Sequence, residues 1–148
     1  MTVDWSEQRC WEDVAEGDEL PPVAFPLTVY RLVVAAGANR DFNDIHHNSE
    51  LARASGAPEM YANTTFLLGM WERTVREYIG VQGSIVGIKG FRMSSFNVVG
   101  QSVTVKGRVA GRREDGPLGL VDLEVWSEHD DGVSVGPGTV TVSLPRRG

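Results

Sequence analysis

The densest group of chemically competent side chains lies in residues 39–52, which read NRDFNDIHHNSELA. This segment holds two of the chain's three histidines, and Asp41 precedes His46 by five residues. A carboxylate and a neutral imidazole can hold one water between them, and each can then take or give a proton during an addition or elimination. Asn43 can hold either group, or the water, without titrating. Asp41 and His46 are therefore our candidate acid/base pair.

Residue types alone leave two other interpretations of this segment open. Asp41 and Asn43 are residue types that cap turns, and His46 and His47 would then be ordinary polar loop residues. Alternatively, Asp41, His46 and His47 would ligate a metal ion. Adjacent histidines seldom point the same way, and the sequence has no further cluster of histidine or cysteine, so we expect no metal.

Composition limits the possible partners. A length of 148 residues fits one domain, and a net charge of -6 disfavours nucleic acid as a partner. Cys10 is the only cysteine, so no intramolecular disulfide forms, which fits a reducing cytoplasm. The sequence has no apolar run of membrane-spanning length, and its start lacks the pattern of a signal peptide. We expect a cytoplasmic protein that binds neither membrane nor nucleic acid.

Helical patterns flank the polar segment, and strands follow them. Residues 19–27 carry three prolines and are expected to be extended, at a sheet edge or irregular. Thr28 is placed to cap a first helix, Asn48 or Ser49 a second, and Gly80 ends the longest one. The predicted helices span residues 29–37, 50–55 and 63–79. Alternating patterns after Gly83 predict strands over residues 84–96, 102–112, 118–128 and 133–144.

These elements define an α+β fold. The long helix has one apolar stripe and the sheet has one apolar face, so an antiparallel sheet wrapped round one central helix buries both. With four or five strands the sheet edges stay open, which favours a dimer. We take residues 1–10 as a tail, pinned by Trp5 and Trp11, and residues 11–148 as the domain.

The motif over residues 41–46 resembles a known family signature. Asp41-Phe42-Asn43-Asp44-Ile45-His46, followed by Ala52, is similar to the Asp-x-Asn-Pro-(Leu/Ile/Val)-His-x5-(Ala/Ser) signature of MaoC-like, R-specific enoyl-CoA hydratases. These are hotdog-fold enzymes. The run over residues 11–20 also resembles the start of that family. The resemblance implies a single hotdog over nearly the whole chain, dimerising into a double hotdog.

Two further runs resemble one subgroup. Residues 40–47 and Tyr61-Ala62-Asn63-Thr64 are similar to the small MaoC-like subunit of actinobacterial steroid side-chain degradation. Asp44, where the family usually has proline, and Asn39-Arg40, where it has Thr/Ser-Gly, both match that subgroup. Members of it pair with a second MaoC-like chain. The resemblance therefore implies either a homodimer, or a heterodimer or heterotetramer with such a chain.

The resemblance also implies roles for individual residues. Asp41 and His46 would be the catalytic acid/base pair, supported by Asn43. The family's His-Gly pair at the start of the central helix is Ala62-Asn63 here, so the Asn63 backbone N–H would polarise the thioester carbonyl. Arg40, Phe42 and Tyr61 would contact the substrate. Further candidates for the nucleotide of coenzyme A are basic residues on the predicted strands: Lys89, Arg92, Lys106 and Arg108.

The function that follows is hydration of a trans-2-enoyl-CoA to a 3-hydroxyacyl-CoA, in steroid side-chain or fatty-acid breakdown. Coenzyme A would be part of the substrate, and no separate cofactor is expected. Two alternatives remain. One is a subunit that only completes the pocket of another MaoC-like chain. The other is a hotdog thioesterase, which would use a carboxylate to direct water at the thioester carbonyl.

Overall fold

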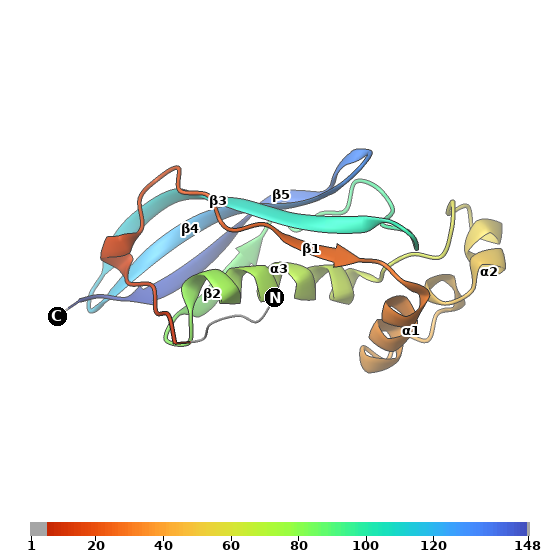
Figure 1. Ribbon diagram of the computed structural model, residues 1–148, viewed down its shortest axis with the longest axis horizontal. Helices are drawn as coiled ribbons and strands as arrows, with labels where there is room; N and C mark the ends of the chain where they lie inside the picture. Colours follow the sequence, from red (N-terminus) through yellow and green to blue (C-terminus); the bar gives the residue numbers. More distant parts are fainter. Residues whose placement is uncertain (1–5, 148) are drawn as a thin grey trace.

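A five-stranded antiparallel sheet curls around one long helix in the computed structural model, which describes residues 6–147 (Figure 1). The helix is α3 (Thr64–Ile79), and the strand order is β1-β3-β4-β5-β2. The strands are β1 (Val23–Pro26), β2 (Ser84–Lys89), β3 (Ser102–Asp115), β4 (Leu118–His129) and β5 (Gly132–Pro145). The predicted sheet around a central helix is confirmed.

The core lies between α3 and the concave face of the sheet. The buried face of α3 carries Leu67, Met70, Trp71, Val75 and Ile79. Opposite them the inward residues of the strands are also buried, as the alternation predicted: Val103, Val105, Val121, Leu123, Val140 and Val142. The Trp71 indole N–H donates to Ser127 Oγ at 2.8 Å, so the one polar atom of that ring is satisfied inside the core.

The strand predicted over residues 84–96 is shorter than expected. β2 ends at Lys89 because Gly90 adopts a φ of 70°, in the left-handed region, where the chain turns away. The segment that follows is irregular and touches the sheet through the single bridge between Met93 and Val135. Two short 3-10 helices were not predicted: η1 (Trp11–Asp13) and η2 (Asp44–His46).

Between β1 and α3 the chain leaves the sheet and forms the helical excursion, residues 28–60. It contains α1 (Val29–Ala38), η2 and α2 (Ser49–Ala54), gathered at the end where α3 begins (Figure 1). The segment 97–101 binds both ends of the excursion. Leu27 exchanges backbone hydrogen bonds with Gly100 and Gln101 at 2.8 Å each, and the Val99 N–H donates to Met60 O at 2.9 Å.

The first described residues attach to the opposite end of α3. The Gln8 side chain donates to Ile79 O at 2.9 Å, and Arg9 donates to Tyr78 O at 3.0 Å. Trp11 packs directly on Gly119, where an added Cβ would meet the indole at 2.0 Å. Trp5, predicted to pin the tail, lies outside the described residues. No helix in the described part of the chain is long and apolar enough to cross a membrane.

Candidate active site at the start of the central helix

The turn after α1 places Asp41. The Asp41 N–H donates to Ala36 O at 2.9 Å and the Arg40 N–H donates to Gly37 O at 3.1 Å, which is the hydrogen-bond pattern of a Schellman C-cap. Arg40 occupies the left-handed position with a φ of 56°, where glycine is usual. A non-glycine residue there costs about 1 kcal/mol. The predicted helix stop at Gly37 is therefore shifted, and the strained Arg40 redirects the chain at Asp41.

His46 is brought to Asp41 by the next turn. Asn43 Oδ1 accepts from the Ile45 N–H at 3.3 Å and so caps η2, which carries His46 into a buried position. His46 Nε2 lies 3.1 Å from Asp41 Oδ2. The Asp41 side chain is 39% exposed and the His46 side chain 9% exposed, so solvent reaches the pair from the carboxylate side.

The backbone carbonyl of Tyr61 orients the His46 ring. His46 Nδ1 lies 2.9 Å from Tyr61 O, and a carbonyl oxygen only accepts, so Nδ1 carries the hydrogen. Nε2 is therefore the nitrogen that faces Asp41, where it can exchange a proton with the carboxylate or with a water. The Tyr61 ring also meets the imidazole edge-on at a centroid distance of 5.2 Å.

Asn63 begins α3 beside this pair. Its Oδ1 accepts from the Phe66 N–H at 2.8 Å and from Asn39 Nδ2 at 3.3 Å, which fixes the orientation of the amide. Asn63 Nδ2 is then left buried and without a partner among residues 6–147, a condition shared only with the Tyr78 hydroxyl. The backbone N–H groups of Asn63, Thr64 and Thr65 have no acceptor in the described chain either. Donors without partners therefore converge at this helix start.

The remaining predicted site residues lie around the pair in different ways. Asn43 is exposed, and its described hydrogen bond is the cap of η2, as the turn interpretation expected. Phe42 is 73% exposed. Tyr61 packs between His46 and Phe96. His47 contacts Asp44 at 3.6 Å instead of Asp41. Over the described range, no three His, Cys, Asp or Glu side chains gather in a way that would hold a metal.

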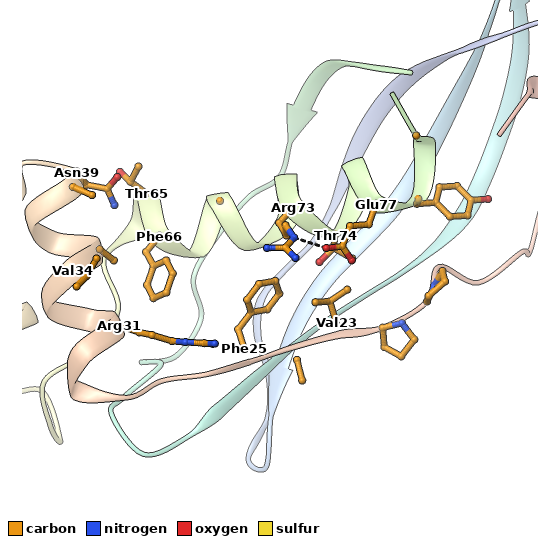
Figure 2. Close-up of a pocket in the computed structure, with 18 of the residues that line it drawn as sticks. Val23, Phe25, Arg31, Val34, Asn39, Thr65, Phe66, Arg73, Thr74 and Glu77 are labelled. Atoms are coloured by element: carbon orange, nitrogen blue, oxygen red, sulfur yellow. Dashed lines mark hydrogen bonds and ion pairs between the residues drawn. The ribbon is translucent and has the colours of Figure 1, made fainter. Parts of the chain in front are cut away.

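A long groove adjoins the site. It lies between α3, β1 and α1, has a volume of about 1290 Å³, and begins at Asn39 and Thr65, next to Asn63 (Figure 2). Phe42 and Tyr61, which were expected to contact the substrate, do not line it, and neither member of the Asp41–His46 pair does.

The basic residues predicted as nucleotide contacts also lie away from the groove. Lys106 pairs with Glu128, and Arg108 pairs with Glu124 at 2.6 Å, on strands β3 and β4. These two cations are therefore engaged in cross-strand ion pairs of the sheet.

Sequence reasoning missed two features here. Asn39 was noted only as a departure from the family pattern, yet it holds the Asn63 amide from 24 residues away. The Tyr61 carbonyl was missed because a backbone group leaves no trace in residue type. The available signal was the position of Tyr61, two residues before the helix cap.

Comparisons with known proteins bear on the fold and the family. No model of a protein family matches the chain. A curated relative, the 3-oxo-4,17-pregnadiene-20-carboxyl-CoA hydratase beta subunit of Mycobacterium tuberculosis, is 30% identical over 116 residues, which cover 78% of this chain and 84% of the relative.

Solved structures agree. The ChsH1-ChsH2 complex from Mycobacterium tuberculosis contains a chain with 29% identity and a TM-score of 0.77, matched over 90% of this chain and 98% of that one. The MaoC-like dehydratase from Rhodospirillum rubrum is 18% identical with a TM-score of 0.80, over 95% and 99% of the two chains. The (R)-hydratase from A. caviae involved in PHA biosynthesis is also 18% identical, with a TM-score of 0.77 over 90% and 99%. The predicted hotdog fold is confirmed, and the chain belongs to the MaoC-like hydratase family.

Proposed function

We propose that this protein is an enoyl-CoA hydratase in which Asp41 and His46 add water across a trans-2-enoyl thioester. The observation that carries the proposal is the 3.1 Å contact between Asp41 Oδ2 and His46 Nε2, in a ring whose other nitrogen is bound by Tyr61 O. A carboxylate and an imidazole in contact can together accept a proton from water and give one to carbon. The pair therefore ends the reaction in the state in which it began.

The chemical step proceeds as follows. A water on the exposed side of Asp41 attacks C3, so a C–O bond forms while the C2–C3 π bond breaks. One member of the pair takes the proton from the water and the other delivers a proton to C2. The product is a 3-hydroxyacyl thioester, of the R type by family resemblance. Asn43 supports the geometry by capping the turn that carries His46.

Negative charge develops on the thioester oxygen during this addition. The donors that would stabilise it are the Asn63 backbone N–H, as the family resemblance suggests, and the Asn63 Nδ2 atom, which has no partner in the described chain. The positive end of the helix dipole at the start of α3 adds to their effect. In this proposal Arg40, Phe42 and Tyr61 contact the substrate around the pair.

The substrate and the partner are inferred from relatives. The curated relative is named as a beta subunit acting on a steroid carboxyl-CoA, and the similar solved structure is a complex of two named chains. We infer a role in steroid side-chain or fatty-acid breakdown, within a hetero-oligomer with a second MaoC-like chain, in the cytoplasm. Coenzyme A would enter as part of the substrate. The outer edge of β2 carries Val86, 60% exposed, and is available for pairing with that chain.

The test is loss of the conjugated enoyl-thioester absorbance. The purified chain receives crotonyl-CoA and then a steroid side-chain enoyl-CoA, each with and without the second MaoC-like chain. Hydration that disappears in Asp41→Asn supports the proposal. Release of free thiol without loss of the double bond would indicate a thioesterase instead. Full hydration by Asp41→Asn together with the second chain would show that this chain only completes another site.

A further inference from the structure

Asn97 and Ser134 are buried polar residues that the proposed reaction does not use, and they are 1% and 0% exposed. We infer that Asn97 is a positioning residue, which fixes residues 60–62 to strand β5 through Ser134. It thereby places the Tyr61 carbonyl, which orients His46. The effect on the reaction rate rests on the proposed function. The anchoring itself is measurable without substrate.

Residues 60–62 lie between η2 and residues 97–99, outside the five-stranded sheet. Both backbone groups of Tyr61 face η2. The Tyr61 N–H donates to Ile45 O at 3.4 Å, and the Tyr61 carbonyl accepts from His46 Nδ1 at 2.9 Å. The imidazole is therefore oriented by a carbonyl whose own position has to be fixed from the other side.

The other side is held by residues 97–99. Two backbone hydrogen bonds of 2.9 Å join them to residues 60–62, and one of these runs from the Ala62 N–H to Asn97 O. The next N–H along the chain is that of Asn63, the proposed donor to the thioester oxygen. A shift of residues 97–99 would therefore move both the carbonyl that orients the imidazole and the proposed oxyanion donor.

The side chain of Asn97 ties these residues to the sheet. Its Oδ1 accepts from the hydroxyl of Ser134, on β5, at 2.6 Å, and its Nδ2 donates to Ser95 O at 3.4 Å. Burying an amide costs free energy unless its polar atoms are bound, and an apolar side chain would avoid that cost. A hydrogen bond at this depth has no competing water and has a preferred geometry. It therefore fixes the place of residue 97 more sharply than apolar packing would.

A second buried serine offers a matched control. Ser127, on β4, is 0% exposed like Ser134, and its Oγ accepts from the Trp71 indole N–H at 2.8 Å. Within the described chain, the Ser127 side chain has no hydrogen bond with residues 60–62 or 97–99. Removing its hydroxyl should weaken the core and leave the Tyr61 carbonyl in place.

The first measurement compares Ser134→Ala with Ser127→Ala in the full chain by amide hydrogen exchange and NMR. Each variant removes one buried hydroxyl and leaves one buried partner without its hydrogen bond, so the general destabilisation should be similar. The amide to follow is that of Ala62, which Asn97 O binds. We expect its protection in Ser134→Ala to fall at least about tenfold below that in Ser127→Ala, because only the first variant loosens this segment locally. Amides in the middle of β3 should be equally protected in both.

The second measurement is steady-state hydration of crotonyl-CoA by the same variants, with the second MaoC-like chain present. Ser134→Ala should lower kcat about tenfold and change KM by less than about twofold, because the reacting groups are misplaced while the contacts that bind substrate remain. Ser127→Ala should keep kcat within about twofold of the wild-type value. Asn97→Ala should lower kcat at least as far as Ser134→Ala, and Ser134→Ala alone decides the matter if Asn97→Ala does not fold.

Equal protection of Ala62 in the two serine variants overturns the inference, and so does an equal kcat. A selective loss of protection upholds the anchoring of residues 60–62, because exchange requires no substrate. If that loss is found while the wild-type protein hydrates no enoyl-CoA, the proposed function fails and the anchoring stands.

Discussion

His46 and His129 are both buried imidazoles with an aspartate nearby, but their environments are opposite. The His46 Nδ1 donates to a carbonyl, so Nε2 is left to face Asp41 at 3.1 Å. At His129 the Nδ1 accepts from the Asp131 backbone N–H at 3.2 Å and therefore carries no hydrogen. The Asp131 carboxylate, 3.6 Å from that same nitrogen and 80% exposed, has nothing there to accept.

The difference lies in how the backbone binds each ring. Separation alone does not distinguish the two sites well, because both distances are below 4 Å. The backbone group that binds Nδ1 decides whether that nitrogen carries the hydrogen. At His46 that group is a carbonyl that also belongs to the approach to α3. At His129 the group is the Asp131 backbone N–H in the turn between β4 and β5, and the ring serves as its acceptor.

The largest expected effect breaks the first pair and spares the second. Asp41→Asn or His46→Ala should lower the hydration rate of an enoyl-CoA by about 10²–10⁴, because one partner of the acid/base pair is lost. His129→Ala should stay within about twofold of the wild-type rate, since it loses only contacts with the β4–β5 turn and with Ser95. Loss of enoyl-thioester absorbance measures both, with circular dichroism to verify folding. Equal losses at the two histidines would refute the distinction.

A smaller effect is expected at the helix start. Asn63→Asp keeps an oxygen that can cap α3 but replaces the donor Nδ2 by a second acceptor. With the backbone N–H still present, kcat should fall about 10- to 100-fold, while KM changes little. Steady-state kinetics separates the two parameters. A wild-type kcat in this variant would mean that Nδ2 does not meet the substrate.

Asn39→Ala tests how much the orientation of the Asn63 amide contributes to the rate. Asn39 Nδ2 donates to Asn63 Oδ1, so the loss of Asn39 should reduce kcat by only a few-fold, about 1 kcal/mol of transition-state stabilisation. The double variant Asn39→Ala with Asn63→Asp should be no slower than Asn63→Asp alone. Additive losses in that double-variant cycle would show that Asn39 acts independently of Asn63.

The third histidine sharpens the comparison further. His47, at the end of η2, contacts Asp44 at 3.6 Å, and both side chains are substantially exposed. Exposed pairs of this kind contribute about 0–1 kcal/mol. His47→Ala should therefore keep the hydration rate within about threefold and shift the urea unfolding midpoint only slightly. A loss of rate comparable to that of His46→Ala would assign the acid/base role to His47 instead of His46.

The smallest expected effect is on stability, at Asp122 of strand β4. Burial tends to raise the pKa of Asp122, but hydrogen bonds from Thr141 and Arg113 outweigh it and the net pKa is lowered. A lowered folded-state pKa stabilises the fold above the unfolded pKa, and this contribution is lost as the pH falls through the folded value. Asp122→Asn should therefore reduce stability modestly at pH 7 and have no such effect in strong acid. Urea unfolding at several pH values measures this, and a pH-independent difference would contradict it.

The fold was predictable because its signals are local. The helical stripe of α3 and the alternation after Gly83 reflect which residues face one core, and both patterns survive in the structure. The identities of Asp41 and His46 were also visible in the motif. Their contact was predicted only as something that the loop must produce, since residue types do not report how a chain turns.

The missed features are those that depend on backbone conformation or on distant neighbours. Arg40 occupies the left-handed position of the Schellman motif, where glycine is usual, so the sequence did not predict this turn. The hydrogen bond from Asn39 to Asn63 joins two helices across 24 residues. The groove is a property of shape, which residue types alone do not report.

The way in which the helical excursion is tied down has an evolutionary consequence. The segment 97–101 closes its two ends at Leu27 and Met60, so residues 28–60 form a loop fastened at its base. The strands pair in register without any residue of the excursion. After gene duplication, one copy can therefore lose or rebuild this loop while keeping its sheet. In such a copy the core between α3 and the sheet would be kept, while Asp41 and His46, which lie in the excursion, would be free to change.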